Sequence, residues 1–490
     1  MASFNTNTTH SPKTRNISGH AAYRYPEKTE LLTRVAACMV GEPKFYGDTT
    51  DATFELAAKL AEEDPAFVAK LAVYARNTLM MRSVSHMLAS VVAASDAARG
   101  TGIVRAMTRA LVRRGDDVTN LIAAWRSFHP DRMVPNGMIK GLRDAMENFT
   151  PYDVAKYREL GKAVTMRDAL RIVHPRAKTP ALADAFDRCV KGTLARPTSW
   201  ETELASCGNN AETWNRLLAA HQVPPMALVR NLRNIVQAGA NLDPVYELLA
   251  DEEALKRSGM LPFRLYTAYR EIRSIAGTKL VRAIDQALGT LALNYPALPG
   301  RTAVFIDGSG SMTWHISEKS TVSCSEVAAL MGAAAALLAD DAYVYIFSGE
   351  AQKLEAAPTT SLLGFTENVL LHSHGGRTDL HAPFEELMKD EIDVDRIIVL
   401  SDNEVNASRS WSPFSKHGIK ACQSDLDAYR AQVGHDVWCH AWDLQGYGSA
   451  QFLGAHTNVL AGFSERALEF VAAAEQGFGA MIEAVEKVEL

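Results

Sequence analysis

The sequence predicts an array of α-helices followed by an α/β domain, and three observations lead to this fold class. From about residue 28 to residue 293, apolar side chains recur at the three-to-four spacing of a buried helix face. A Pro/Gly-rich segment at 294–300 ends that pattern, and short apolar runs then alternate with helical segments. A chain of 490 residues also exceeds what one core organises, so we expect at least two domains.

Turn signals divide the helical half into segments of ordinary helix length. They lie at 63–65, 99–102, 114–117 and 223–225, and each contains Gly or Pro. Because few segments there have strand character and no strict repeat is present, we expect a degenerate α-solenoid of paired helices. Residues 1–20, rich in Asn, Thr and Ser, are expected to be a flexible N-terminus, and residues 21–293 to form the helical domain.

The second half, residues 301–490, has the pattern of a doubly wound domain. We expect strands at 302–307, 342–347, 396–401 and 436–442, where apolar and β-branched residues cluster. Helices are expected at 325–338, 382–389, 425–433 and 465–476. Such alternation predicts a mostly parallel sheet covered by helices.

The net charge of −6 conceals two halves of opposite sign. Residues 1–300 hold 39 Lys and Arg against 30 Asp and Glu, whereas residues 301–490 hold 12 against 27. The basic excess is densest at 101–200, with 18 basic and 10 acidic side chains. Any nucleic acid should therefore meet the helical half, although a solvated basic helical surface without a ligand is the alternative.

Cysteine usage and the absence of targeting signals indicate the cellular compartment. The six cysteines are scattered without a CxxC pair, which argues against a disulfide scaffold or a zinc site and favours a reducing compartment. The N-terminus lacks the layout of a signal peptide, and no apolar run reaches the roughly 18 residues that span a bilayer. We expect a cytoplasmic protein.

A candidate metal site follows the first expected strand. The residues at 307–311 are Asp-Gly-Ser-Gly-Ser, a turn that can direct one carboxylate and two hydroxyls to one point. Later strand ends add the Thr378 hydroxyl and the Asp402 carboxylate. An all-oxygen donor set suits a hard divalent cation, Mg²⁺ first, with Mn²⁺ or Ca²⁺ possible.

This order of residues resembles the metal-ion-dependent adhesion site (MIDAS) of von Willebrand factor A domains. The resemblance implies an open ligand position that an acidic group of a partner, or water, completes. No general base or nucleophile accompanies the motif, so we expect no catalysis. The resemblance implies that metal is bound, directly or through water, by Asp307, Ser309, Ser311, Thr378 and Asp402.

The segment around Thr378 departs from the pattern of that family. Arg377 stands between Gly376 and Thr378, where many relatives have Gly-Gly-Thr-Asp, and this leaves the geometry of the loop open. Because their spacing is irregular, three nearby histidines are interpreted as loop residues rather than zinc ligands. They are His372, His374 and His381.

Basic side chains with regular spacing are the candidate RNA contacts. Arg167, Arg171 and His174 are four and three positions apart and share one helix face, a stripe that suits phosphate oxygens. His174 could instead be a capped core histidine before Pro175. The full candidate set is Lys140, Arg143, Lys156, Arg158, Lys162, Arg167, Arg171, His174, Arg176, Lys178, Arg230 and Arg233.

A helical array fused to such an A domain resembles the TROVE proteins, the Ro ribonucleoprotein family with its bacterial members. The resemblance rests on the segments at 170–175, 214–218, 227–232, 261–264 and 401–404, and spans the chain from about residue 20. It implies a ring of HEAT-like repeats closed by the A domain, an outer surface that holds small non-coding Y RNAs, and a hole that admits single-stranded 3′ ends of defective RNAs.

Residue by residue, the resemblance implies that a basic segment and His174 contact Y RNA, and that Lys140 and Arg143 line the hole. The spacing from Lys156 to His174 differs slightly from that of relatives, so Lys162 has the weakest match among the carried-over positions.

Three function classes follow from these patterns. The first is a non-catalytic RNA-binding scaffold for RNA quality control, with a monomeric protein component and an exoribonuclease or RNA-repair enzyme as partner. The second is a metal-dependent protein-adhesion module on a helical scaffold. The third, a metal-dependent hydrolase or a chelatase subunit, is disfavoured because no GxxxxGK[ST] loop or positioned base is present.

Overall fold

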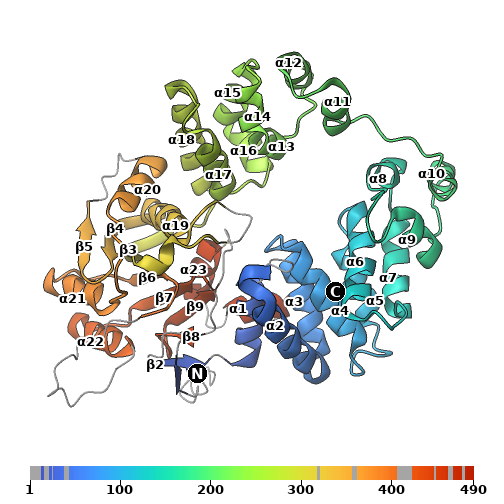
Figure 1. Ribbon diagram of the computed structural model, residues 1–490. Coiled ribbons are helices and arrows are strands. Elements are labelled where there is room, and N and C mark those ends of the chain that lie inside the picture. The colour runs from blue at the N-terminus through green and yellow to red at the C-terminus, as the bar shows by residue number, and fades with distance from the viewer. Residues whose placement is uncertain are drawn as a thin grey trace. The chain divides into compact units, whose positions relative to one another are not determined.

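In the computed structural model of the protein, the described residues are 13–15, 21–24, 26–37, 43–316, 321–355, 361–405, 422–445, 449–461, 467–476 and 480–490. They form two compact units (Figure 1). The helical unit comprises Glu27–Thr198 with Met481–Leu490, and the sheet unit comprises Met1–Pro26 with Ser199–Ala480. The expected domain bounds of 1–20, 21–293 and 301–490 stay predictions.

The helical unit consists of α-helices that pack against near neighbours in the chain, as α3 does on α4 and α5 on α7. A C-terminal helix returns to it, since the Lys28 ammonium lies 2.8 Å from Asp64 and 3.4 Å from Glu486. The helices are α1 (Glu27–Ala37), α2 (Pro43–Glu63), α3 (Pro65–Asn77), α4 (Arg82–Ala94), α5 (Ile103–Leu111), α6 (Gly115–Phe128), α7 (Asn136–Met146), α8 (Pro151–Lys156), α9 (Met166–Val173), α10 (Pro180–Lys191) and α24 (Ala480–Glu486).

The turn signals of the sequence coincide with helix starts. Asp64 caps α3 by accepting a hydrogen bond from the Phe67 N–H at 3.0 Å, and Pro65 occupies the first helical turn, where it costs no hydrogen bond. Asp117 accepts the Arg114 N–H at 3.0 Å at the start of α6. The Pro224-Pro225 pair likewise begins a helix. Local capping chemistry thus explains where these helices begin.

Eight further helices belong to the sheet unit although they precede the sheet in sequence. Polar contacts join α17 to the A domain, because Tyr266 and Arg270 contact Glu326 at 3.3 and 2.7 Å, and Tyr269 donates to Glu367 at 2.6 Å. The helices are α11 (Trp200–Cys207), α12 (Ala211–Ala219), α13 (Pro225–Arg230), α14 (Leu232–Gln237), α15 (Asp243–Ala250), α16 (Glu252–Arg257), α17 (Pro262–Ile272) and α18 (Thr278–Ala292).

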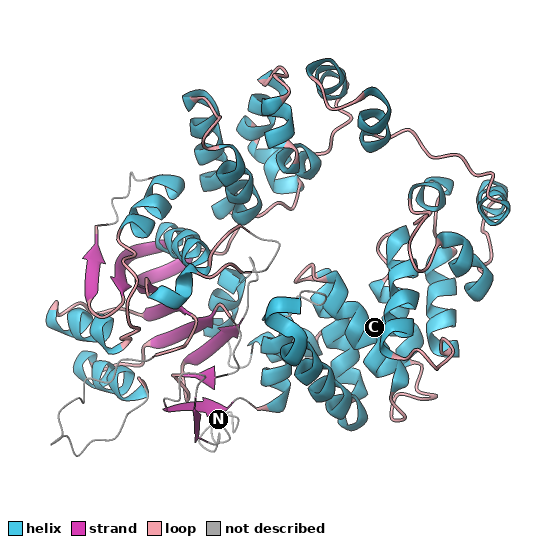
Figure 2. Ribbon diagram, in the orientation of Figure 1, coloured by secondary structure: helices cyan, strands magenta, loops and turns pink. Residues whose placement is uncertain are grey.

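The main sheet has the strand order β5-β4-β3-β6-β7-β9, and all its pairs are parallel except β4 with β5 (Figure 2). The mostly parallel sheet expected from the sequence is confirmed, whereas edge strands β5 and β9 were not foreseen. The strands are β3 (Leu298–Asp307), β4 (Ala339–Phe347), β5 (Ala351–Leu354), β6 (Arg396–Ser401), β7 (Trp438–Asp443) and β9 (Thr457–Ala461).

Helices cover both faces of this sheet. Phe305 and Val399 belong to one core with residues of α21 and α22, while a Cβ on Gly332 of α19 would meet Ile306 at 2.5 Å on the other face. Four of the helices match the expected ranges to within two residues, and α20 is an addition. The helices are α19 (Cys324–Leu338), α20 (Leu362–Leu371), α21 (His381–Lys389), α22 (Gln423–Val433) and α23 (Ala467–Gln476).

Two segments differ from expectation because of long-range contacts. The linker expected at 294–300 ends early, since Leu298 pairs with Ala339 and the buried Arg396 guanidinium donates to the carbonyl oxygens of Leu298 and Pro299 at 3.3 and 2.7 Å. The expected flexible N-terminus contains β1 (Lys13–Arg15). This strand pairs with β2 (Ala21–Arg24), which pairs with β8 (Ser449–Ala450). The rest of 1–20 lies outside the described residues.

None of the described helices is both long enough and apolar enough to cross a membrane.

Candidate metal centre and candidate nucleic-acid interface

The motif at 307–311 forms the expected tight turn at the carboxyl end of β3. Asp307 is buried, and its Oδ1 accepts the Ser309 N–H at 2.8 Å, which folds the chain back beside the carboxylate. A short 3₁₀ turn, Gly310–Thr313, follows and carries Ser311. The hydroxyl oxygens of Ser309 and Ser311 lie 3.3 Å apart. The turn therefore brings together the first three predicted ligands.

The loop that carries Thr378 is held against this turn by backbone hydrogen bonds. The Gly375 N–H donates to the Gly308 carbonyl at 3.0 Å, and the Gly310 N–H donates to the Gly376 carbonyl at 3.2 Å. Gly375 and Gly376 have φ of 72° and 102°, a left-handed conformation that glycine adopts without strain. Thr378 is buried. The loop is thus held against the turn at the two glycines that precede Arg377 and Thr378.

Asp402 follows β6, the strand next to β3, and supplies the second carboxylate. Its Oδ1 accepts the Glu404 N–H at 3.2 Å, whereas its buried Oδ2 has no hydrogen-bond partner among the described residues. Burial, with the charge of Asp402 next in size, raises the pKa of Asp307, and burial also raises the pKa of Asp402. Two buried carboxylates and a surrounding set of hydroxyl oxygens are a donor set that fits a hard divalent cation.

A third carboxylate at this edge was missed by the sequence reasoning. Asp443 ends β7, the next strand along, and is fully buried. Its Oδ1 accepts the Gln445 N–H at 3.1 Å. The signal was available, because Asp443 directly follows the strand expected at 436–442, as Asp402 follows its own strand.

Two of the three histidines near Thr378 share a pocket, and the third lies elsewhere. His372 and His374 line a pocket of about 440 Å³ together with Gly308 and Arg377. His381 is not a loop histidine, which corrects the expectation: it begins α21, and its Nδ1 lies 2.5 Å from Asp425 Oδ2. The partner of His381 is Asp425, on a helix 44 positions further along the chain, and the local spacing of the histidines carries no signal of such a contact.

The predicted RNA-binding residues of the helical unit divide into two groups. Some make contacts within the fold: Arg143 donates twice to the Val173 carbonyl, at 3.1 and 2.9 Å, and Arg158 donates to the Leu194 carbonyl. Lys156 lies 5.5 Å from the ring centroid of Tyr152, and Arg167 is half-buried. The exposed members are Lys140, Lys162, Arg171, His174, Arg176 and Lys178, of which Lys178 also donates to Asn148 at 2.7 Å.

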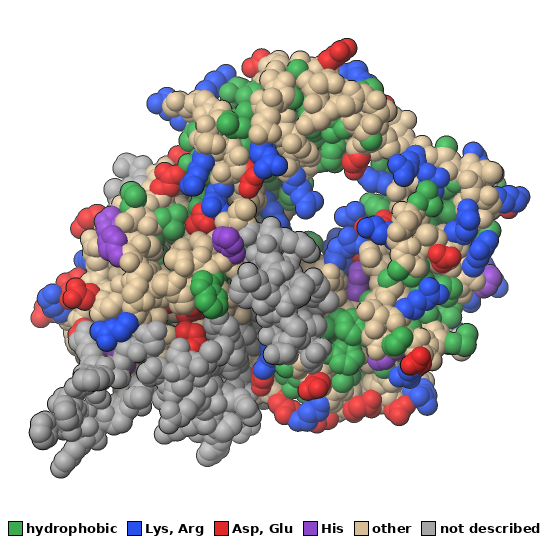
Figure 3. All heavy atoms as spheres, viewed as in Figure 1, with side chains coloured by type: hydrophobic (Ala, Val, Ile, Leu, Met, Phe, Trp, Pro, Cys, Tyr) green, Lys and Arg blue, Asp and Glu red, His purple; other side chains and the backbone are tan. Residues whose placement is uncertain are grey.

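His174 ends α9 in a left-handed conformation with φ of 48° and is exposed, so it is not a core histidine. Arg171 is exposed within the last turn of the same helix. Figure 3 shows Lys and Arg side chains gathered over the part of the helical unit that holds α8, α9 and α10. We name the six exposed residues of the preceding paragraph the basic surface.

Arg230 and Arg233 belong to the sheet unit. They line a pocket of about 330 Å³ with Arg264 and Thr321, and Arg233 also pairs with Glu271 at 2.7 Å. Arg264 was not among the predicted contacts, although it lies in the 261–264 segment that carried the family resemblance. Its position at the start of α17, beside α13 and α14, is a tertiary feature.

The fold defines the class of protein: a helical array joined to a von Willebrand factor A-type domain. We name the sheet edge that carries Asp307, Ser309, Ser311, Thr378 and Asp402 the MIDAS-like edge, after the resemblance in the sequence. Two family descriptions match the sequence, "TROVE domain" at residues 185–287 and "Ro60 vWA domain" at residues 301–435. Residues 185–287 are therefore similar to a TROVE domain, and residues 301–435 are similar to the Ro60 vWA domain.

Individual relatives agree with this assignment. The chain is 26% identical over 268 residues to RNA-binding protein RO60 of Caenorhabditis elegans, covering 49% of this chain and 41% of that protein. It is 28% identical over 210 residues to RNA-binding protein RO60 of Deinococcus radiodurans, covering 37% and 38%. Telomerase protein component 1 of mouse is 22% identical over 334 residues, covering 50% and 13%. The matches thus span less than half the length of these relatives.

The fold also matches a solved structure. The crystal structure of the Deinococcus radiodurans RO (RSR) protein superposes with a TM-score of 0.66, covering 91% of this chain and 99% of that chain at 17% identity. At that identity the match establishes a shared fold.

Proposed function

We propose that this protein is a non-catalytic RNA-binding scaffold that holds a small, Y-like non-coding RNA and captures single-stranded 3′ ends of structured or misfolded RNA. The observation that carries the proposal is the basic surface, six cationic or titratable side chains exposed around α7 and α9. Two relatives bear the name RNA-binding protein, which supports the same reading.

Phosphate contact explains how such a surface would work. Exposed guanidinium and ammonium groups donate to phosphate oxygens of any sequence, and each contact releases counterions from the RNA. Binding would therefore be salt-sensitive and would depend on RNA shape more than on base identity. Arg143 and Arg158, whose donors serve backbone carbonyls, would support the surface rather than bind RNA themselves.

The first experiment measures binding of a structured RNA with a single-stranded 3′ tail across a salt series. The double variant Arg171→Glu/Arg176→Glu should bind at least about tenfold more weakly. The slope of its affinity against salt concentration should also be shallower, by the amount that corresponds to the loss of about two phosphate contacts. A matched control, Lys389→Glu on the exposed face of α21, should bind like the wild type. Unchanged affinity and slope in the double variant would refute this placement of the site.

The arginine pocket of the sheet unit is the proposed place for the single-stranded tail. Three guanidinium groups, those of Arg230, Arg233 and Arg264, line it and suit successive phosphates. Arg230→Glu/Arg264→Glu should remove the affinity gained from the tail and leave the binding of the same RNA without a tail unchanged. Equal losses for tailed and tailless RNA would contradict a tail site.

We further propose that the MIDAS-like edge binds Mg²⁺ and serves a protein partner, such as an exoribonuclease or an RNA-repair enzyme. The acidic charge of residues 301–490 disfavours RNA there and leaves the edge available to another protein. Metal-dependent adhesion is then a second function of the same chain. A partner whose capture requires Mg²⁺ and is lost in Asp307→Ala, with RNA binding retained, would support it. RNA cleavage that disappears in that variant would overturn the non-catalytic assignment.

A further inference from the structure

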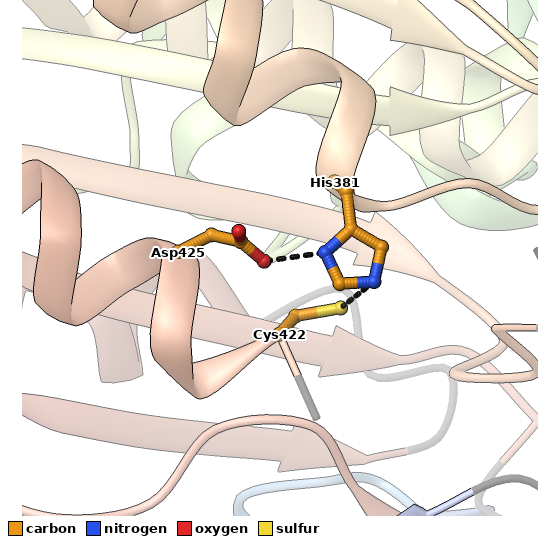
Figure 4. Close-up of side chains that lie close together, drawn as sticks. All are labelled: His381, Cys422 and Asp425. Atoms are coloured by element: carbon orange, nitrogen blue, oxygen red, sulfur yellow. Dashed lines mark hydrogen bonds and ion pairs between the residues drawn. The ribbon is translucent and has the colours of Figure 1, made fainter. Parts of the chain in front are cut away.

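Three side chains with metal-ligating atoms meet at a place separate from the MIDAS-like edge. His381 is the first residue of α21, while Cys422 precedes α22 and Asp425 lies in its first turn. Asp425 Oδ2 lies 2.5 Å from His381 Nδ1, and Cys422 Sγ lies 3.9 Å from His381 Nε2. Figure 4 shows the imidazole between the carboxylate and the sulfur.

The fold aims these groups at one another. Cys422 and Asp425 are three positions apart at the start of one helix and therefore face the same side. The adjacent helix α21 packs against α22, and its first residue faces that side. Both helix starts carry partial positive charge, which favours a thiolate and a carboxylate there.

Burial differs across the cluster in a way that suits an ion. The Cys422 side chain is fully buried, whereas the side chains of His381 and Asp425 are 19% and 24% exposed. A thiolate in such a place is costly unless a cation is bound to it. Because the sulfur is fully buried while the imidazole and the carboxylate are part-exposed, a metal ligand is favoured over a nucleophile that must meet a larger substrate.

We propose that His381, Cys422 and Asp425 bind a divalent metal of the zinc class through an imidazole nitrogen, a thiolate and a carboxylate oxygen, with water in the fourth position. One candidate ligand atom from each residue lies within 4.8 Å of the other two. A mixed sulfur, nitrogen and oxygen set selects Zn²⁺ or Co²⁺ over Mg²⁺, which prefers oxygen alone.

Binding of the metal ion displaces protons from its ligands. The short contact between His381 and Asp425 holds one proton, and the Cys422 thiol holds another, so both protons pass to solvent as the ion enters. At tetrahedral zinc, nitrogen and oxygen ligands stand roughly 3.3 Å apart, so the His381–Asp425 contact must lengthen, which rotation of the part-exposed Asp425 side chain allows. The alternative is a metal-free hydrogen-bonded cluster that only joins α21 to α22.

Cobalt distinguishes this site from the MIDAS-like edge. The untagged full-length protein is first saturated with Mg²⁺, which occupies oxygen sites, and then titrated with Co²⁺. One Co²⁺ per chain should bind with a sulfur-to-cobalt charge-transfer band, release about two protons, and be displaced by Zn²⁺. The MIDAS-like edge has no sulfur ligand and cannot produce that band. Absence of the band in the wild type would overturn the proposal.

Variants assign the band to these residues. Cys422→Ser should lose it, and Asp425→Asn should weaken Co²⁺ binding about 10–100-fold. Cys207→Ser, which removes an exposed thiol on α11, and Asp307→Asn should keep both band and affinity. A band that persists in Cys422→Ser refutes the site. Should that variant fail to fold, unchanged affinity in folded Asp425→Asn refutes it instead.

Discussion

Two buried carboxylates of the molecule have pKa values that are shifted in opposite directions. Asp117, in the helical unit, accepts hydrogen bonds from Arg76 at 2.7 Å and from Arg82 at 3.2 Å. Burial alone would raise the pKa of Asp117, but the His86 imidazole, 3.5 Å away, and the hydrogen bond from Arg76 outweigh it and hold that pKa well below its usual range. Asp307, in the sheet unit, is also fully buried, yet burial and the neighbouring Asp402 raise its pKa.

The difference separates a structural carboxylate from a candidate metal ligand. Around Asp117 the chain supplies the compensating cations itself, and the pair stays charged and fixed. Around Asp307 it supplies hydroxyls and a second carboxylate, which leaves positive charge to come from outside the chain. A buried acid without an internal cation is therefore the feature that makes this edge a candidate cation site.

The largest expected effect tests the structural side of the comparison. Asp117→Ala should lower the free energy of unfolding by about 3–5 kcal/mol, because it leaves Arg76 buried and uncompensated. Urea denaturation followed by circular dichroism measures the change. Arg99→Ala, which breaks an exposed pair with Asp96, should change it by less than about 0.5 kcal/mol. Equal losses of unfolding free energy in Asp117→Ala and Arg99→Ala would contradict a structural role of the buried Asp117 carboxylate.

A second prediction tests the functional side. Mg²⁺ at about 100 times its Kd should stabilise the wild type by about 2.7 kcal/mol, since the ion binds the folded protein alone. Asp307→Asn should abolish this Mg²⁺-dependent rise in thermal stability. The control Glu475→Gln, which alters a part-buried carboxylate of the same unit, should respond to Mg²⁺ like the wild type. A wild type that Mg²⁺ leaves unchanged would contradict a cation site at this edge.

The smallest expected effect sharpens the comparison within the sheet unit. Glu475 accepts hydrogen bonds from Arg396 at 2.6 and 2.8 Å and from His440 at 3.1 Å. Burial opposes ionisation, but Arg396 and His440 lower the pKa of Glu475 to about 2. Glu475→Gln should therefore cost about 2 kcal/mol at pH 7.

The pH dependence of that loss has a definite sign. A lowered carboxyl pKa contributes stability above the unfolded value of about 4.3, and the contribution disappears as the pH falls toward 2. The difference between wild type and Glu475→Gln in urea denaturation should shrink between pH 5 and pH 3. A constant difference over that range would mean that the Glu475 carboxylate is not the source of the stability.

Much of the candidate metal site was predictable because local chemistry specifies it. A β-branched strand that ends in Asp-Gly-Ser-Gly-Ser places its carboxylate and hydroxyls in one turn whatever surrounds them. Asp443 was missed although it follows the strand expected at 436–442 just as Asp402 follows the strand at 396–401. The metal ligands and RNA contacts named from the sequence stay predictions, since binding depends on partners.

Long-range contacts account for what the sequence reasoning missed. The spacing of His381 and Cys422, 41 positions apart, has no local signature, and only the packing of α21 on α22 brings them together. Arg143 and Arg171 look alike in the sequence, yet one donates to a buried helix end and the other faces solvent. Equivalent charges acquire different roles from the elements that pack beside them.

The sequence by itself determined the two-part architecture, the starts of capped helices such as α3, and the turn at 307–311, because hydrophobic period, capping and turn preference act over a few residues. Only the tertiary structure decided that helices α11–α18 group with the sheet, that the 294–300 linker partly joins β3, and which basic side chains remain exposed. Those outcomes depend on burial and pairing between residues far apart in the chain, where no local pattern acts.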